Sequence, residues 1–354
     1  MNKKHIVTSI GVVLLTTGVI GGIWSGIDAM PIVINNAQMA EEKYNKEEVI
    51  YKSELKLTKL NIESNISNVI INKYNGKDVV VERSGNKELS NITTEANNNE
   101  LVIKEERNNS RKSTKSVDDI VKYVVGEMYS PHYSEITVYV PENLDLNVKT
   151  NNGMLYVNEG IELNNVDFST QYGGISFAKE SKVKNLNIKS ESGITLQVGE
   201  IYCAENVNIE ASNVYINEDN YTSKGAKIPE NVKISVPNDH YESNNVSINS
   251  KSPIAKNLVI DSNATVELEL PLLDYKFNFD IKTSRGIGFD DYNYEKYMGT
   301  VLEKYFKYNP EEDNYDSDEE GYKQKELVGL MNEELKDEAT GYNINIKSGM
   351  VIFN

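Results

Sequence analysis

Cysteine and histidine are scarce in this sequence of 354 residues, which contains one cysteine and three histidines. A single cysteine, Cys203, excludes an intramolecular disulfide and any zinc site built from several cysteines. The histidines His5, His132 and His240 stand far apart, and no H-E-x-x-H, G-x-S-x-G, P-loop or G-x-G-x-x-G motif is present. The sequence therefore lacks the markers of the common enzyme classes. We interpret Cys203 as a buried structural thiol.

Positive charge is also in short supply, because 37 Lys and Arg residues stand against 54 Asp and Glu residues, a formal net charge of −17. So acidic a surface repels the phosphates of nucleic acids. We therefore expect no nucleic-acid partner. Hydrophobic residues make up 39% of the chain and charged residues 26%, which is typical of a folded protein.

Charge is absent altogether from Ile6 to Ile27, a run of 22 residues. As a helix rising about 1.5 Å per residue, this run reaches about 33 Å and can cross a membrane. Lys3 and Lys4 precede the run and Asp28 follows it, which predicts a cytoplasmic N-terminus and an extracytoplasmic C-terminal domain. The sequence therefore predicts a single-pass signal anchor in the cell membrane.

A cleaved signal peptide is the alternative, and it would secrete the rest of the chain. Its apolar core is typically about 7–15 residues long and precedes a small-residue cleavage site. The run here is longer, and the candidate sites near Ala29 and Ala40 place Ile27 and Gln38 where a small residue belongs. A buried core helix is a third interpretation. We divide the chain into residues 1–30 (cytoplasmic tip and anchor), 31–52 (polar stalk) and 53–354 (exported domain).

A unit of about 20 residues recurs in the exported domain. It reads apolar-x-apolar-x-small, then a turn, then apolar-x-apolar, an alternation typical of half-buried strands. Four successive copies begin at Leu146, Val166, Leu186 and Val207, at intervals of 20, 20 and 21 residues. Further copies begin at Leu60, Val246, Leu258, Phe279 and Tyr342.

The small residue of each copy suggests a tight corner, and the glycine or asparagine that follows suggests a turn that needs backbone freedom. The small residues are Thr150, Thr170, Ser190, Ala211, Ser250, Ser262, Thr283 and Ser348, and the turn residues are Gly153, Gly174, Gly193, Asn213, Gly286 and Gly349. A fixed period over several copies indicates stacked structural units. We therefore predict an all-β fold, a β-solenoid or β-helix-like repeat, with an antiparallel β-sandwich as the alternative.

Two segments interrupt the repeat, at about residues 107–133 and 292–340. In the first, Val117, Ile120, Val121 and Val124 are spaced like one face of a helix. In the second we expect two helices, at about residues 292–307 and 323–337, around an acidic turn. We interpret both segments as helical insertions between strands.

The run LTKLNIESNISNVIINKYNGKDVVVERSG and the later repeats VKTNNGMLYV and IKSESGITLQV resemble the DUF4097 family. The resemblance covers about residues 55–290 and resumes at 340–354. It implies a β-solenoid-like body behind an N-terminal membrane segment on the bacterial cell surface, in proteins described as "putative adhesins". It brings no catalytic residues.

The acidic turn holds a candidate calcium site. Asp316, Asp318 and Glu320, with Gly321 in the sixth position, match the start of an EF-hand loop. The twelfth position, which should supply a bidentate glutamate, is Leu327. A solvated acidic loop is the alternative, and we expect no other cofactor.

Tyrosines Tyr294, Tyr305 and Tyr315 in the same insertion are candidate binding residues, because tyrosine rings bury much area at low entropic cost. Packing in the core fits their spacing equally well. The carboxylates Asp167, Glu191 and Glu210 could stack on one face, as in the glycan-active β-helix enzymes, although an outward acidic residue between two apolar ones usually just faces solvent.

We predict a non-enzymatic, membrane-anchored surface protein that serves as an adhesin or binding scaffold for cell-wall glycan or an envelope protein. One alternative is a membrane-proximal accessory of envelope-stress signalling, and a second is a glycan-active β-helix enzyme.

Overall fold

The computed structural model describes residues 47–108, 134–218, 227–237, 245–289, 297–303, 325–332 and 341–354, except residues 75, 77, 88, 159, 298 and 301. The chain divides into two compact units, of which the first comprises Met1–Glu48, Arg83–Leu89 and Asn108–Ser134. Within this unit, Lys87 pairs with Glu48 at 2.6 Å and Arg83 donates to the carbonyl of Lys87 at 3.0 Å. The second unit comprises Val49–Glu82, Ser90–Arg107 and Glu135–Asn354 and contains most of the strands.

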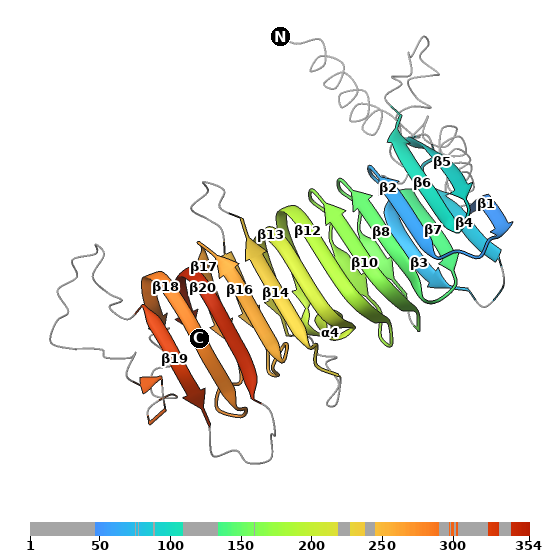
Figure 1. Cartoon of the computed structure of the whole chain (residues 1–354). Helices are drawn as coiled ribbons and strands as arrows, with labels where there is room; N and C mark the ends of the chain where they lie inside the picture. Colours follow the sequence, from blue (N-terminus) through green and yellow to red (C-terminus); the bar gives the residue numbers. More distant parts are fainter. Residues whose placement is uncertain are drawn as a thin grey trace, which may run out of the picture. The chain divides into compact units, whose positions relative to one another are not determined.

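A first ladder of strands is parallel throughout except at its two ends (Figure 1). In spatial order its strands are β5 (Ser90–Asn97), β6 (Glu100–Arg107), β2 (Lys59–Ser64), β8 (Leu144–Thr150), β10 (Glu162–Thr170), β12 (Lys182–Gln197), β13 (Ala204–Asn217), β14 (Asn231–Val236), β16 (Asn257–Ser262), β20 (Tyr342–Phe353), β18 (Phe277–Phe289) and β19 (Glu326–Met331). The terminal strands β5 and β19 pair antiparallel with β6 and β18.

A second set of strands follows the corners. A six-stranded sheet has the order β1 (Glu48–Glu54), β4 (Asp78–Gly85), β7 (Ser134–Val140), β3 (Asn68–Lys73), β9 (Leu155–Val157) and β11 (Ile175–Phe177). The long strands β12, β13, β18 and β20 continue past the corner, and their second halves pair in parallel with one another and with β15 (Asn245–Asn249) and β17 (Thr265–Glu269).

The registers confirm the repeat that the sequence predicts. Val166 lies beside Leu146 on one side and Leu186 on the other, and Leu186 lies beside Val207. Because the first and third residues of each copy point inward, these apolar side chains form one continuous core, in which all are buried except the partly buried Tyr342. The parallel pairing shows that the antiparallel sandwich is wrong.

The small residues close the corners as expected, and most of them are buried. Ser64 donates to the carbonyl of Ser67 at 2.8 Å, and Thr150 accepts from the N–H of Gly153 at 2.8 Å. The turn glycines have a different role from the one predicted, since only Gly286 has a positive φ. At Gly153 an added Cβ would lie 2.1 Å from the carbonyl oxygen of Ser67 in the neighbouring coil, so close stacking requires glycine there.

Three sequence predictions need correction. Cys203, interpreted above as a buried thiol, is only half-buried and is the C-cap of a short helix, α4 (Val198–Tyr202). Strand β1 begins at Glu48, inside the expected stalk. The segment at about 323–337, expected as a helix, instead contains strand β19, which pairs with the free edge of β18. Its buried residues Leu327 and Met331 are four positions apart, a spacing that places them on one face of a strand as well as of a helix.

Most residues of the two predicted insertions lie outside the described part of the chain. Residues 109–133 and 304–324 lie outside the described part, as does the charge-free segment Ile6–Ile27. Among the described residues, no helix is long and apolar enough to span a bilayer.

Candidate functional site

A row of amide side chains, which ends on one carboxylate, runs across the first ladder with one residue from each strand from β8 to β18. We call it the asparagine row, and its members in spatial order are Asp145, Asn165, Asn185, Asn206, Asn231, Asn257, Asn343 and Asn278. Each asparagine immediately precedes a buried apolar residue of its strand. Parallel strands in register place equivalent side chains about 4.8 Å apart, which suits a chain of amide hydrogen bonds.

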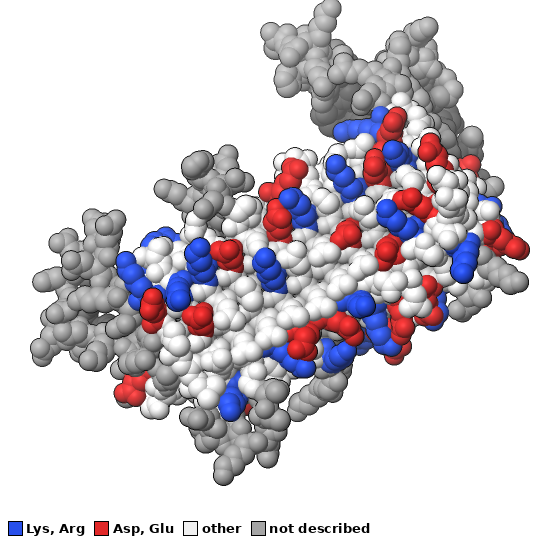
Figure 2. All heavy atoms as spheres, in the orientation of Figure 1, with Lys and Arg blue, Asp and Glu red and all other residues white. Residues whose placement is uncertain are grey.

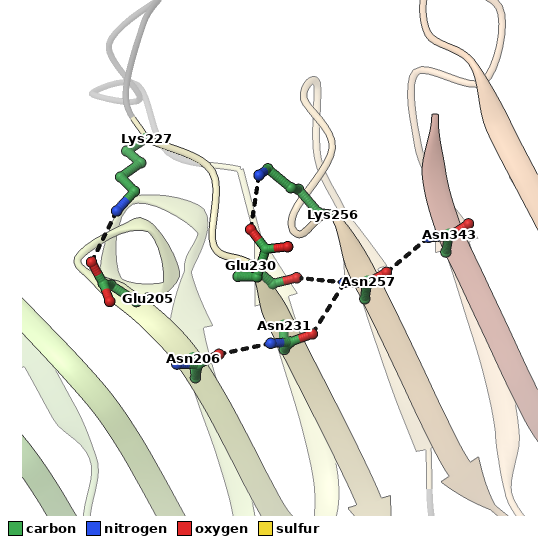
Figure 3. Close-up of polar contacts among 8 residues, drawn as sticks. All are labelled: Glu205, Asn206, Lys227, Glu230, Asn231, Lys256, Asn257 and Asn343. Carbon is green, nitrogen blue, oxygen red and sulfur yellow. Dashed lines mark hydrogen bonds and ion pairs between the residues drawn. The ribbon is translucent and has the colours of Figure 1, made fainter. Parts of the chain in front are cut away.

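Seven hydrogen bonds link the eight residues, with lengths from 2.7 to 3.1 Å. In each link the Nδ2 of one asparagine donates to the Oδ1 of its neighbour. Near the middle, Asn206 accepts from Asn231 at 2.8 Å, and Asn231 accepts from Asn257 at 3.1 Å (Figure 3). The row therefore forms a continuous, directional array from β8 to β18.

Unused hydrogen-bonding capacity remains along this array. An asparagine amide has two N–H donors and two acceptor lone pairs, and the row engages one of each at an interior position. Asn257 is an exception, because it also donates to the carbonyl of Glu230 at 3.1 Å. Asn185 and Asn206 are half-buried, whereas Asn231 and Asn278 are exposed. The row thus presents polar atoms to solvent at the regular spacing of the strands.

Ion pairs border the row at the starts of the same strands. Lys182 lies 2.6 Å from Glu162, Lys227 lies 2.9 Å from Glu205, and Lys256 lies 2.8 Å from Glu230. In each pair the lysine Nζ also donates a hydrogen bond to the glutamate carboxylate, and the pairs of Lys227 and Lys256 appear beside the row in Figure 3.

The charges of these pairs offset one another. The hydrogen bond and positive charge of Lys182 lower the pKa of Glu162, and Glu162 raises the pKa of Lys182. Lys227 lowers the pKa of Glu205 in the same way. All three groups are exposed, so the pairs contribute little to stability. Figure 2 shows an uncharged band on this face, with acidic and basic side chains gathered along its border.

The carboxylates considered for catalysis do not come together. Asp167 lies in a row with Asn147 and Asn187 and accepts a hydrogen bond of 2.7 Å from Asn187. Glu210 lies in a different row, where it pairs with Lys189 at 2.6 Å. Glu191 follows the corner residue Ser190 and belongs to neither row. This arrangement does not provide the stacked carboxylates that the enzyme hypothesis needs, and no cluster of metal-binding side chains occurs among the residues that the structure describes.

The candidate sites in the second insertion stay predictions. Asp316, Asp318 and Glu320 lie outside the described residues, and so do Tyr294, Tyr305 and Tyr315. Sequence reasoning missed the asparagine row, although a signal was present. An asparagine stands directly before a buried apolar residue in seven strands, but the spacing between copies is regular only from Asn165 to Asn206.

A second polar site lies at the other end of the ladder, around the buried Glu105 of β6. Its Oε2 accepts hydrogen bonds from the backbone N–H groups of Asn65, Ile66 and Ser67 at 2.9 to 3.1 Å. The hydroxyl groups of Ser67 and Ser90 also donate to this carboxylate, and Oγ of Ser64 lies 2.9 Å from Oε2, where its single proton is shared between Glu105 and the carbonyl of Ser67. Burial raises the pKa of Glu105, but the hydrogen bonds outweigh burial and the pKa lies below its ordinary value. Glu105 is therefore a buried anion that holds the corner between β2 and β3.

The chain was also compared with known proteins. A sequence model described as Toastrack DUF4097 matches residues 57–300. A crystal structure of a "putative adhesin" from Bacteroides fragilis NCTC 9343 is similar at 13% identity and a TM-score of 0.34, over 63% of this chain and 88% of that one. A "putative cell adhesion protein" from Clostridium sporogenes ATCC 15579 is similar at 12% identity and a TM-score of 0.19, over 87% of this chain and 96% of that one. No curated protein matches the chain.

Proposed function

The chain belongs to the Toastrack DUF4097 family, and on this premise we propose that it is a non-enzymatic cell-surface protein whose β-solenoid binds an envelope glycan along the asparagine row. The observation that carries the proposal is the unbroken row of seven amides across neighbouring strands. An adhesin-type role needs a large, rigid, repetitive surface, and parallel stacking supplies one.

The chemistry of the row favours a polymer rich in hydroxyl groups. Each spare amide N–H can donate to a sugar hydroxyl, and each spare lone pair can accept from one. Hydrogen bonds of this kind are individually weak, so binding needs many of them along one chain. A polysaccharide lying across the strands would meet an equivalent amide about every 4.8 Å.

The charge of the protein favours a neutral glycan over a polyanion. The net charge is −17, and Lys182, Lys227 and Lys256 at the border of the row are paired with Glu162, Glu205 and Glu230. The excess of negative charge would therefore repel a polyanionic wall polymer. We propose an uncharged polysaccharide as the ligand class.

Display at the cell surface follows from the expected anchor. In this proposal Ile6–Ile27 spans the membrane and the repeat domain lies outside the cell. A protease added to intact cells should then degrade the repeat domain, and fractionation should leave the protein in the membrane. Recovery of the protein in the culture medium would instead support signal cleavage.

Binding by the purified full-length protein tests the proposal. Affinity electrophoresis would measure the affinity for hydroxyethyl cellulose, a neutral polysaccharide, and for polygalacturonate, an anionic one. The variant N206A/N231A/N257A should lose at least tenfold in affinity. The control variant N72A/N158A removes an amide pair from the other set of strands and should bind as the wild type does.

Thermal unfolding would first show that both variants are folded, and each binding result then supports a different conclusion. Equal affinity of the wild type and the triple variant for the glycan would show that the asparagine row is not the binding surface. Absence of glycan or cell-wall binding, with capture of a membrane protein that depends on the anchor, would favour the signalling alternative.

A further inference from the structure

Strand β20 stands out of sequence order in the first ladder. It lies between β16 and β18, so the last strand of the chain separates two strands that precede it (Figure 1). The step from Asn257 in β16 to Asn278 in β18 is 21 residues, the same as that from Asn185 to Asn206, whose strands are direct neighbours. Strand β18 therefore has the spacing of a coil that would stack next, yet β20 occupies that place.

Backbone hydrogen bonds hold β20 along both edges. At its start, the N–H of Tyr342 donates to the carbonyl of Lys276 at 2.9 Å, and the N–H of Asn343 donates to that of Lys256 at 2.8 Å. After its end, the N–H of Asn354 donates to the carbonyl of Leu268 at 2.9 Å. The strand is thus paired from end to end within a slot whose walls are β16–β17 on one side and β18 on the other.

Side chains of β20 match the slot by type. Ile344, Ile346, Val351 and Phe353 alternate inward and are buried. Outside, Asn343 completes the asparagine row, since it donates to Asn257 at 2.8 Å and accepts from Asn278 at 3.1 Å. The slot therefore selects an extended peptide with apolar residues at alternate positions and an amide beside the first of them.

The corner of the slot adds a steric requirement. An added Cβ at Gly349 would lie 2.3 Å from the carbonyl oxygen of Asn263. On the other side, Ser284 donates to the carbonyl of Gly349 at 3.3 Å. Arg285 reaches past β20 to Thr265 in β17, where its Nη2 lies 3.3 Å from Oγ1, and so links the two walls.

We propose that this slot is an interaction site between copies of the chain, in which the segment Gly341–Asn354 of a second copy replaces the chain's own β20. Every contact that β20 makes is available to the same segment from another copy, and the pairings join it to residues 65 and 86 positions earlier rather than to its neighbours in sequence. Reciprocal exchange gives a dimer in which both slots are filled, the usual result of domain swapping. The site lies beyond the glycan-binding role and does not depend on it.

Engineered cysteines test the exchange. Val259 of β16 and Asn345 of β20 are direct neighbours on the outer face, and Cys203 is the chain's one cysteine, so a C203A background leaves no other thiol. Full-length C203A/V259C and C203A/N345C proteins would be unfolded together in urea, refolded together and oxidised in air. A disulfide-linked dimer is the expected product.

The triple variant C203A/V259C/N345C is the matched control, because its disulfide can form within one chain. If the control forms its disulfide and the mixture gives no linked dimer, exchange between copies is overturned.

A second measurement covers the case in which neither disulfide forms. A protease recognition sequence placed between residues 332 and 341 of the full-length chain allows β20 to be cut free after folding. A fluorescent peptide of residues 341–354 should then replace the cut strand in a one-to-one complex, and the G349A peptide should bind at least tenfold more weakly. Failure of the unsubstituted peptide to enter the cut protein, or equal binding by both peptides, would rule out the slot as a strand-binding site.

Discussion

The backbone N–H of Ser67 donates a hydrogen bond of 3.1 Å to Oε2 of Glu105, a residue 38 positions later in the chain. The same oxygen accepts from the N–H groups of Asn65 and Ile66, so three consecutive backbone donors of a corner converge on one carboxylate. Buried backbone N–H groups need partners, and the neighbouring strand β6 supplies one here through a side chain. Glu105 takes that role at the corner between β2 and β3.

Replacing Glu105 by Gln should destabilise the protein. The amide has one oxygen and no charge, so several buried donors lose a charge-assisted acceptor. We expect the free energy of unfolding to fall by about 2–4 kcal/mol, measured by urea denaturation. The exposed neighbour Glu106 provides the control, and E106Q should leave the urea midpoint unchanged. A midpoint for E105Q equal to that of the wild type would contradict the proposed role.

The contribution of Glu105 should also depend on pH. Its pKa in the folded protein lies below the ordinary value of 4.5, so the unfolded chain takes up a proton at higher pH than the folded one. The stabilisation is therefore fully present above about pH 5.5 and is lost as the pH falls through the folded-state pKa. The difference in unfolding free energy between the wild type and E105Q should be constant from about pH 6 to 8 and should narrow below about pH 4. A difference that stays the same at low pH would show that the pKa is not lowered.

Stacking at the corners predicts unequal effects for adjacent glycines. A Cβ at Gly173 would lie 2.1 Å from the carbonyl oxygen of Gly153, whereas a Cβ at Gly174 would meet only the flexible side chain of Met154. We expect G173A to lower the free energy of unfolding by about 2–4 kcal/mol and G174A by less than about 1 kcal/mol, because a backbone carbonyl cannot move aside as a flexible side chain can. Thermal unfolding of the two variants in parallel would settle the order, and a larger loss for G174A would refute the steric argument.

Position within the asparagine row should determine the cost of losing an amide. Asn206 is half-buried and bonded on both sides, while Asn278 is exposed and bonded on one side. N206A should therefore lower the free energy of unfolding by about 1–2 kcal/mol, and N278A by less than about 0.5 kcal/mol. Equal effects in urea denaturation would mean that the row does not act as a connected array.

Much of the fold could be predicted from the sequence because alternation is local. The apolar residues of the copies at Leu146, Val166, Leu186 and Val207 lie where the 20-residue period places them. The copy that begins at Val232 was missed, because no glycine follows it and its second strand, β15, starts only at Asn245. The separate copy predicted at Val246 is wrong, since Val246 lies in β15 and pairs with Val214 of the second half of β13. Strand β19 was expected as helix because its two buried residues fit either period, and only the free edge of β18 decides between them.

The candidate site was less accessible than the fold. Asparagine is common in surface loops and turns, so its place before each apolar pair carries no special meaning until the strands are in register. The row is continuous only because Asn343, which is 65 residues after Asn278, enters between it and Asn257.

The sequence by itself determined the all-β class, the repeat of about 20 residues and the small corner residues, because alternation and turn chemistry act between residues close together in the chain. Only the tertiary structure decided the order of the strands, the unbroken asparagine row and the capping of the 65–67 corner by Glu105. These depend on partners 38 to 86 residues apart, whose meeting is set by which strand edges and buried donors remain unsatisfied once the local elements have formed.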